Sequence, residues 1–275
     1  MISRRKATQI ICFILCLVLV IGVGLSTWKY YMTGRLLKSI EIQDYEEFQS
    51  TLPYVFDLEG LPYPPLFCTL SQNYYRTSLQ LACEVGNFEM VKLLCEKGAD
   101  INGVNQYAPF SPLMLAATGL SESNLDIVEY LLQQGADVSY RKDAYNADVL
   151  FQIASSRYSI PNIDKIIDQL VKNGGDVYYF HKSYGTLLNI SAYWGTDDVL
   201  VYLLQNYEID PNLGIKGQTA LMNYCRNQTV DVEIVELFLD CGADKTLIDI
   251  DGKTAYDYAI ENGHMEVASL LKLNS

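Results

Sequence analysis

The sequence predicts an all-α solenoid of about six helix–turn–helix repeats with finger loops, following one apolar N-terminal segment. Two observations lead to this fold class. A short pattern of residues recurs along the last three-quarters of the 275-residue chain, and each copy contains two apolar stripes at helical spacing. With 49% hydrophobic and 12% aromatic residues, the composition is also that of an ordered protein.

Each copy of the pattern pairs a first short apolar run with a second run that ends near a glycine and an aspartate. The first copy reads T-S-L-Q-L-A-C-E-V-G at residues 77–86, and its second run ends L-L-C-E-K-G-A-D-I-N at residues 93–102. This pattern resembles the ankyrin repeat, whose period is about 33 residues. The resemblance implies stacked helix pairs joined by fingers. The six copies begin 34, 38, 37, 33 and 35 residues apart, at Thr77, Ser111, Val149, Thr186, Thr219 and Thr254.

The residue types at the joints of the copies support this interpretation. The threonine or serine that opens five of the copies has a side-chain oxygen that caps a helix N-terminus. The glycines after the second runs suit a left-handed C-cap, which has no room for a Cβ. Because one repeat cannot bury its apolar face alone, stacking must supply the stability. These glycines are Gly98, Gly135, Gly174 and Gly242.

The copies also depart from the pattern. Residues 119–124 and 157–163 lengthen the helix–helix turns of the second and third repeats, and residues 206–210 replace the Gly-Ala-Asp corner of the fourth. Residues 35–52 predict two short helical pieces that form a degenerate capping repeat. The predicted domains are therefore a signal-anchor or transmembrane segment at 1–31, a capping repeat with its connection at 32–72, and an ankyrin-repeat domain at 73–275.

The N-terminal segment is uncharged from residue 7 to residue 28. As a helix it reaches roughly 33 Å, enough for a hydrocarbon core of about 30 Å. The basic residues at 4–6 predict a cytoplasmic N-terminus and a repeat domain on the periplasmic side of the inner membrane. Two alternatives remain open. The segment is a cleaved signal peptide that leaves a periplasmic domain, or translation from Met32 gives a cytoplasmic form.

The net charge of the chain after the N-terminal segment limits the classes of partner that we expect. Residues 41–275 contain 14 basic and 33 acidic residues, a formal charge of -19. Such a surface repels phosphate backbones, which excludes nucleic acid and favours a partner with a basic surface. The seven cysteines include no C-x-x-C pair, so they are interpreted as small buried hydrophobes rather than as metal or redox sites.

No catalytic or metal-binding arrangement is found in the sequence. There are two histidines. His264 follows Gly263 where ankyrin repeats commonly carry Gly-His, and His181 has no second histidine or cysteine nearby to complete a metal site. Residues 249–252 resemble a calcium loop, but leucine and tyrosine fall at its first and twelfth ligand positions. We therefore expect no enzymatic activity, no catalytic residue, no cofactor and no metal.

Aromatic residues in the third and fourth fingers are the predicted partner contacts. The chain has 21 tyrosines, and tyrosine, tryptophan and arginine are enriched among binding hot spots. The alternative is that these side chains pack against neighbouring fingers and fill the gaps of irregular repeats. The predicted partner-binding residues are Tyr140, Arg141, Tyr145, Tyr178, Tyr179, Phe180, His181, Tyr184, Tyr193 and Trp194.

The layout of the chain, an export or anchor segment followed by an acidic ankyrin solenoid, is similar to that of ankyrin-repeat immunity proteins encoded beside bacterial type VI secretion lipase effectors. The resemblance implies a non-enzymatic protein, monomeric when free, that binds and neutralises a lipase toxin at the cell envelope. Two alternatives share the protein-binding role. The chain is an envelope scaffold or adaptor that holds a partner enzyme, or it regulates a membrane complex.

Overall fold

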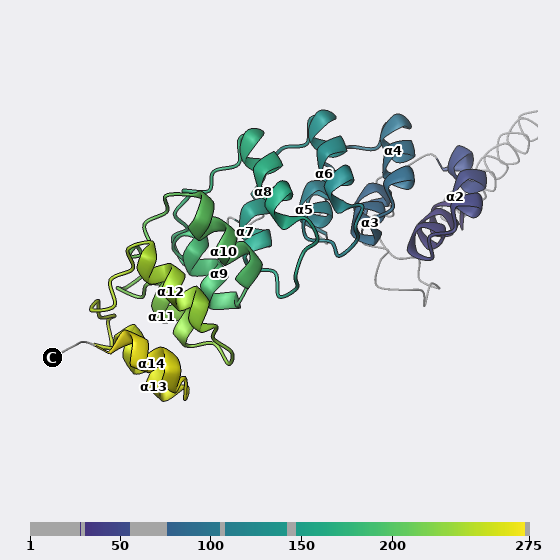
Figure 1. The fold of residues 1–275 in the computed structure, drawn as a ribbon. Coiled ribbons are helices and arrows are strands. Elements are labelled where there is room, and N and C mark those ends of the chain that lie inside the picture. Colours follow the sequence, from purple (N-terminus) through teal and green to yellow (C-terminus); the bar gives the residue numbers. More distant parts are fainter. Residues whose placement is uncertain (1–27, 29–30, 56–75, 105–107, 142–146, 273–275) are drawn as a thin grey trace, which may run out of the picture. The chain divides into compact units, whose positions relative to one another are not determined.

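The computed structural model describes residue 28 and residues 31–55, 76–104, 108–141 and 147–272 (Figure 1). These residues form helices and turns and no β-strand, which confirms the all-α prediction. The chain divides into two compact units, Met1–Pro112 and Leu113–Ser275. The predicted membrane or signal segment lies outside the described residues, apart from Trp28. Among the helices that are described, none is long and apolar enough to cross a bilayer.

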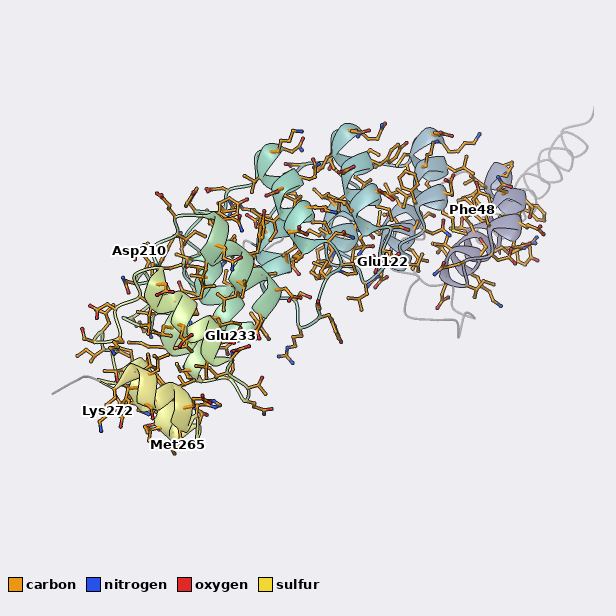
Figure 2. All side chains as sticks on the ribbon, viewed as in Figure 1. Phe48, Glu122, Asp210, Glu233, Met265 and Lys272 are labelled. Carbon is orange, nitrogen blue, oxygen red and sulfur yellow. The ribbon has the colours of Figure 1, made fainter. Side chains whose placement is uncertain are left out.

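The first unit begins with the predicted pair of short helical pieces. Residues 31–41 are helical, and α2 (Tyr45–Thr51) follows, capped by the Asp44 side chain, which accepts a hydrogen bond from the Glu47 amide at 2.9 Å. Phe48, labelled in Figure 2, is fully buried. Arg35 Nε donates to Glu47 Oε1 at 2.7 Å and so ties the helical segment to α2. A 3-10 turn, η1 (Leu52–Tyr54), ends this part of the chain.

The first complete repeat also lies in this unit, as α3 (Ser78–Val85) and α4 (Phe88–Glu96). Thr77 and Gln80 form a capping box at the start of α3, and their backbone and side-chain groups bond reciprocally. The fully buried Gln80 also donates from Nε2 to the carbonyls of Ala108 at 3.0 Å and Phe110 at 2.8 Å. One side chain therefore both caps the helix and fixes the finger that follows.

The second unit contains the remaining repeats, and α5 (Pro112–Ala117) begins at its boundary. The first helices α7, α9, α11 and α13 pack in one row, and the second helices α6, α8, α10, α12 and α14 pack in another. The bounds of these helices are α6 (Asn124–Gln133), α7 (Val149–Ala154), α8 (Ile163–Lys172), α9 (Leu187–Trp194), α10 (Asp197–Asn206), α11 (Ala220–Cys225), α12 (Val232–Asp240), α13 (Ala255–Glu261) and α14 (Met265–Leu271).

Capping boxes open the last three first helices, as the repeat pattern predicts. Thr186, Thr219 and Thr254 each accept a hydrogen bond from the backbone amide three residues later. The glycines predicted to follow second helices adopt left-handed φ, for example 101° at Gly174 and 88° at Gly242. Local sequence thus sets both ends of the regular repeats.

Two connections between helices lack this regular capping. Both lie where the sequence departs from the repeat pattern. The turn between α7 and α8 contains Asn162 at a left-handed φ of 56°. The helix α10 ends at an extended Tyr207, with no glycine. There, Tyr202 and Tyr207 both donate to Asp168 Oδ1, at 2.5 and 3.4 Å. A tyrosine–aspartate contact therefore takes the place of the usual corner.

The cysteines and His264 belong to the packing of the repeats. Cys83 and Cys225 are buried free thiols, and burial raises the pKa of Cys225 to about 12. A thiol that stays protonated behaves as the small hydrophobe that the sequence predicts. Cys95 and Cys241 are only half-buried. A ring nitrogen of His264 lies 2.8 Å from the carbonyl oxygen of Asn227, which places this histidine in a structural contact.

Candidate protein-interaction surface

The third finger, between α6 and α7, contributes Tyr140 and Arg141 to the predicted contacts, and Tyr145 lies outside the described residues. The Arg141 guanidinium carbon lies 3.6 Å from the centroid of the Tyr179 ring, and its Nη2 lies 3.4 Å from Asp148 Oδ2. Burial raises the pKa of Asp148, while hydrogen bonding from the Phe151 amide and the charge of Arg141 lower it. Arg141 therefore compensates a buried carboxylate and joins two fingers by stacking.

The fourth finger, between α8 and α9, closes on itself at His181. The His181 amide donates to the Gly185 carbonyl at 2.7 Å, and the Gly185 amide returns a bond of 2.8 Å. The His181 ring lies 5.1 Å from the rings of both Phe151 and Tyr184, and its Nδ1 accepts from the Ser183 amide at 3.1 Å. His181 is 5% exposed. The finger turns this ring inward, so His181 packs within the protein, and its contact with a partner stays a prediction.

The tip of the fourth finger keeps two of the predicted contacts accessible. Tyr178 is 59% exposed and Phe180 is 42% exposed, whereas Tyr179 between them is half-buried under Arg141. The tip is a turn in which the Tyr179 amide donates to the Asp176 carbonyl at 3.3 Å, and this turn gives neighbouring aromatic residues different exposures. Tyr178 and Phe180 stay predicted contacts, and Tyr179 is held in the packing of the two fingers.

The two aromatic residues at the end of α9 also differ in exposure. Tyr193 is 52% exposed, and Trp194 is half-buried. Their rings lie 5.4 Å apart at 86°, and the Arg157 guanidinium carbon lies 4.7 Å from the Trp194 ring centroid. Arg157 belongs to the lengthened turn between α7 and α8. Trp194 thus packs on the irregular turn, which matches the alternative interpretation that aromatic residues fill gaps.

A groove of about 570 Å³ lies between the fingers and the first helices of the last three repeats. We call it the finger groove. Residues from three fingers, from α9, α11 and α13, and from the C-cap of α11 line it. Two predicted contacts, Tyr184 and Tyr193, are among them, whereas Trp194 is not. Its polar and charged lining includes Lys182, Lys216, Asn223, Arg226, Asp249 and Tyr258.

One wall of the finger groove is a closed hydrogen-bonded unit in the sixth finger. Tyr258 donates its hydroxyl to Asp249 Oδ2 at 2.5 Å, and Asp249 Oδ1 accepts from the amides of Asp251 at 2.9 Å and Lys253 at 3.0 Å. Burial alone raises the pKa of Asp249, but these hydrogen bonds bring it below its ordinary value. Both carboxylate oxygens are thus already engaged, and the finger assignment of residues 249–252 is confirmed.

The floor of the groove contains an acceptor that is not satisfied. Asn223 is 8% exposed, and its Nδ2 donates to the Asn189 carbonyl at 3.4 Å. Its Oδ1 is buried and has no hydrogen-bond partner among the described residues. A buried acceptor without a donor costs about 1–3 kcal/mol. This oxygen has less than 1 Å² of accessible surface, so it is a cost of the packing under the groove and not a contact that is open to a bound molecule.

Arg226 was missed by sequence reasoning, and the repeat register is the signal that indicates it. It lies seven residues after Thr219, as the predicted contact Tyr193 lies seven residues after Thr186. Both residues lie at the C-terminal end of a first helix and line the groove. Within the described residues, no group of three or more His, Cys, Asp or Glu side chains is placed to hold a metal.

Comparisons with known proteins agree with this geometry. The profile described as Ankyrin repeats (3 copies) matches residues 66–142 and 162–275. The rat protein named Ankyrin repeat and SAM domain-containing protein 6 is 43% identical over 72 residues, which are 26% of this chain and only 8% of that protein's length.

Solved structures match over more of the chain. The human ASB11 ankyrin repeat domain has a TM-score of 0.67 at 20% identity, covering 87% of this chain and 98% of that one, and shows the fold. A chain in the complex of the predatory endopeptidase Bd0816 from Bdellovibrio bacteriovorus with the immunity protein Bd3460 has a TM-score of 0.55 at 26% identity, covering 70% of this chain and 95% of that one. The ankyrin fold is generally a non-enzymatic protein-interaction module. This chain belongs to the ankyrin-repeat family.

Proposed function

We propose that this chain is an immunity protein whose ankyrin solenoid binds a secreted hydrolytic enzyme and blocks its activity. The observation that carries the proposal is the finger groove, an open site with tyrosine, lysine and arginine side chains on its walls. Tyrosine and arginine in such a setting are typical binding hot spots. The likeness to a chain from an endopeptidase–immunity protein complex, over 95% of that chain, supports this class of partner.

The partner that we favour is a lipase toxin of a type VI secretion system. The order of an apolar N-terminal segment and an acidic repeat domain supports this choice, because that layout is similar to the lipase immunity proteins. The formal charge of -19 on residues 41–275 favours a partner with a basic surface, since opposite net charges steer association. An endopeptidase is the other enzyme class to test, because the neighbouring complex contains one.

The proposed location is the inner membrane, with the repeat domain in the periplasm. Residues 7–28 would supply the anchor, and the basic residues before them would hold the N-terminus in the cytoplasm. A phospholipase that attacks the envelope would then meet its inhibitor at the membrane. Cleavage of the segment would give a periplasmic form, and a start at Met32 a cytoplasmic form. Sequencing the N-terminus of the protein purified from membranes distinguishes the three.

The test is co-expression of the full chain with the hydrolase encoded beside its gene. We expect a one-to-one complex, loss of lipase activity in vitro, and survival of cells that export the toxin to the periplasm. Peptidase activity of the same partner is assayed in parallel. A complex that leaves the enzyme active would support the alternative role of an envelope scaffold or adaptor. Absence of both complex and protection would refute the immunity role.

A further inference from the structure

We infer that the finger groove receives an acidic loop of the protein partner, whose carboxylates pair with the exposed cations Lys182, Lys216 and Arg226. This inference rests on the proposed role as a protein-binding inhibitor, and it specifies the chemistry of the contact. It also runs against the overall acidity of the chain, from which a basic surface alone would be expected.

The available charge in the groove is positive. Lys182, Lys216 and Arg226 all line it and are exposed. Neither lysine forms an ion pair within the described part of the chain, and Arg226 stacks on the Tyr258 ring, with its guanidinium carbon 5.2 Å from the centroid. Against these stand two acidic residues. Both oxygens of Asp249 already accept hydrogen bonds within its own finger, and the three cations outnumber the two anions.

The rim of the groove suits a protein loop rather than a small polar ion. Ile250 lines the groove and is 73% exposed, and its amide donates to the Lys216 carbonyl at 3.0 Å, which fixes the two fingers side by side. Ile248 nearby is 60% exposed. The volume of about 570 Å³ falls in the range of about 300–1,000 Å³ that is typical of ligand sites.

An acidic chain with a cationic groove can attract a basic partner and still bind an acidic loop of that partner. The net negative charge of the chain steers a basic partner surface from a distance, and this attraction is screened beyond about 8 Å at physiological salt. Contacts inside the groove are formed at hydrogen-bond distance, where the local cations dominate. A partner that is basic overall and carries an acidic loop fits both.

The experiment uses the full chain in detergent and a phage library of random twelve-residue peptides. Selection is carried out on the native protein, on the double variant Lys182→Glu/Lys216→Glu, and on Lys165→Glu/Lys172→Glu as a matched control. The control lysines are exposed on α8, away from the groove lining. We expect the native protein and the control to enrich peptides rich in aspartate and glutamate, and the groove variant to lose them at an unchanged melting temperature.

Enrichment of basic or uncharged peptides, identical peptides on the groove variant, or no enrichment overturns the inference. Acidic enrichment without toxin binding leaves the inference in place and rejects the immunity role. Equal toxin inhibition by the groove variant and the control rejects the inference alone.

Discussion

The third and fourth fingers carry most of the predicted aromatic contacts, whereas the fifth and sixth fingers, with the end of the fourth, line the open groove. In the third and fourth, Tyr179 lies under Arg141 and His181 packs on Phe151 and Tyr184. In the fifth and sixth, Lys216 is exposed and Ile250 is 73% exposed. Several aromatic side chains of the third and fourth fingers are thus packed inside the protein. The fifth and sixth fingers keep exposed side chains that are open to a partner.

Part of the difference lies in the turns behind the fingers. The long turn before α8 brings Arg157 onto the Trp194 ring, so large side chains pack there. The capping boxes do not separate the two regions, because Thr186, Thr219 and Thr254 close them behind the fourth, fifth and sixth fingers alike. An aromatic-rich irregular repeat is therefore not by itself a sign of a binding surface.

The largest expected effect comes from removing the inward-facing ring of the fourth finger. His181→Ala deletes contacts with two aromatic rings and the bond from the Ser183 amide, and should lower the free energy of unfolding by about 2–3 kcal/mol. Urea unfolding measures it. The matched control is Tyr178→Ala in the same finger, which is 59% exposed and should cost less than about 0.5 kcal/mol. Equal losses for the two variants would contradict the inward packing of this finger.

A smaller effect is expected at the end of α9. Trp194→Ala removes a half-buried ring that stacks under Arg157, and should cost about 2 kcal/mol. Phe180→Ala, at an exposed fingertip, should leave the melting temperature within a degree or two and reduce toxin affinity instead. Should Trp194→Ala lower affinity without lowering stability, Trp194 would be a partner contact after all.

The repeat architecture was largely predictable from the sequence, because its determinants are local. Thr77, Thr186 and Thr219 cap helices through bonds three residues away, and Gly174 and Gly242 relieve strain at single positions. Such features repeat with the sequence period and need no knowledge of distant contacts.

The candidate site was predictable only in part, because the direction of a finger side chain depends on non-periodic geometry. The bonds between His181 and Gly185 turn the histidine inward, and nothing in residue type reveals them. The missing partner of Asn223 Oδ1 is likewise a property of three packed first helices. Residue type alone predicted Tyr184 and Tyr193 as partner contacts, whereas Arg226 is indicated only by the repeat register.

Removing a helix cap should cost about 1 kcal/mol of unfolding free energy in a regular repeat and almost nothing in an irregular one. Thr219→Ala removes the acceptor for the Met222 amide, and should destabilise the second unit by about that amount. Ser123 precedes α6 in the lengthened second repeat and makes no capping hydrogen bond with its side chain. Ser123→Ala should therefore be close to neutral in thermal unfolding. A cost at Ser123 that matched the one at Thr219 would show that the long turn also depends on a side-chain cap.

The smallest expected effect is a difference in acid sensitivity. In the sixth repeat, hydrogen bonds from Thr254 lower the pKa of Asp257, and those from Tyr258 outweigh burial to lower that of Asp249. These groups stabilise the fold above their ordinary pKa of 3.8, and that stability is lost as the pH falls through their lower folded values. Burial raises the pKa of Asp148, so its contribution has the opposite sign: it is present at low pH and lost as the pH rises through the folded value.

Acidification from pH 6 to about pH 3 should therefore weaken α13 more than α7, because the carboxylates behind the two helices respond in opposite directions. Hydrogen exchange of the two helices, corrected for the intrinsic rate at each pH, measures the difference. In Asp249→Asn, α13 should be less protected at pH 6 and should lose less on acidification, since one titrating group is gone. Parallel loss of protection in α7 and α13 would show that acid acts on the second unit as a whole, through its net charge and not through these hydrogen-bonded carboxylates.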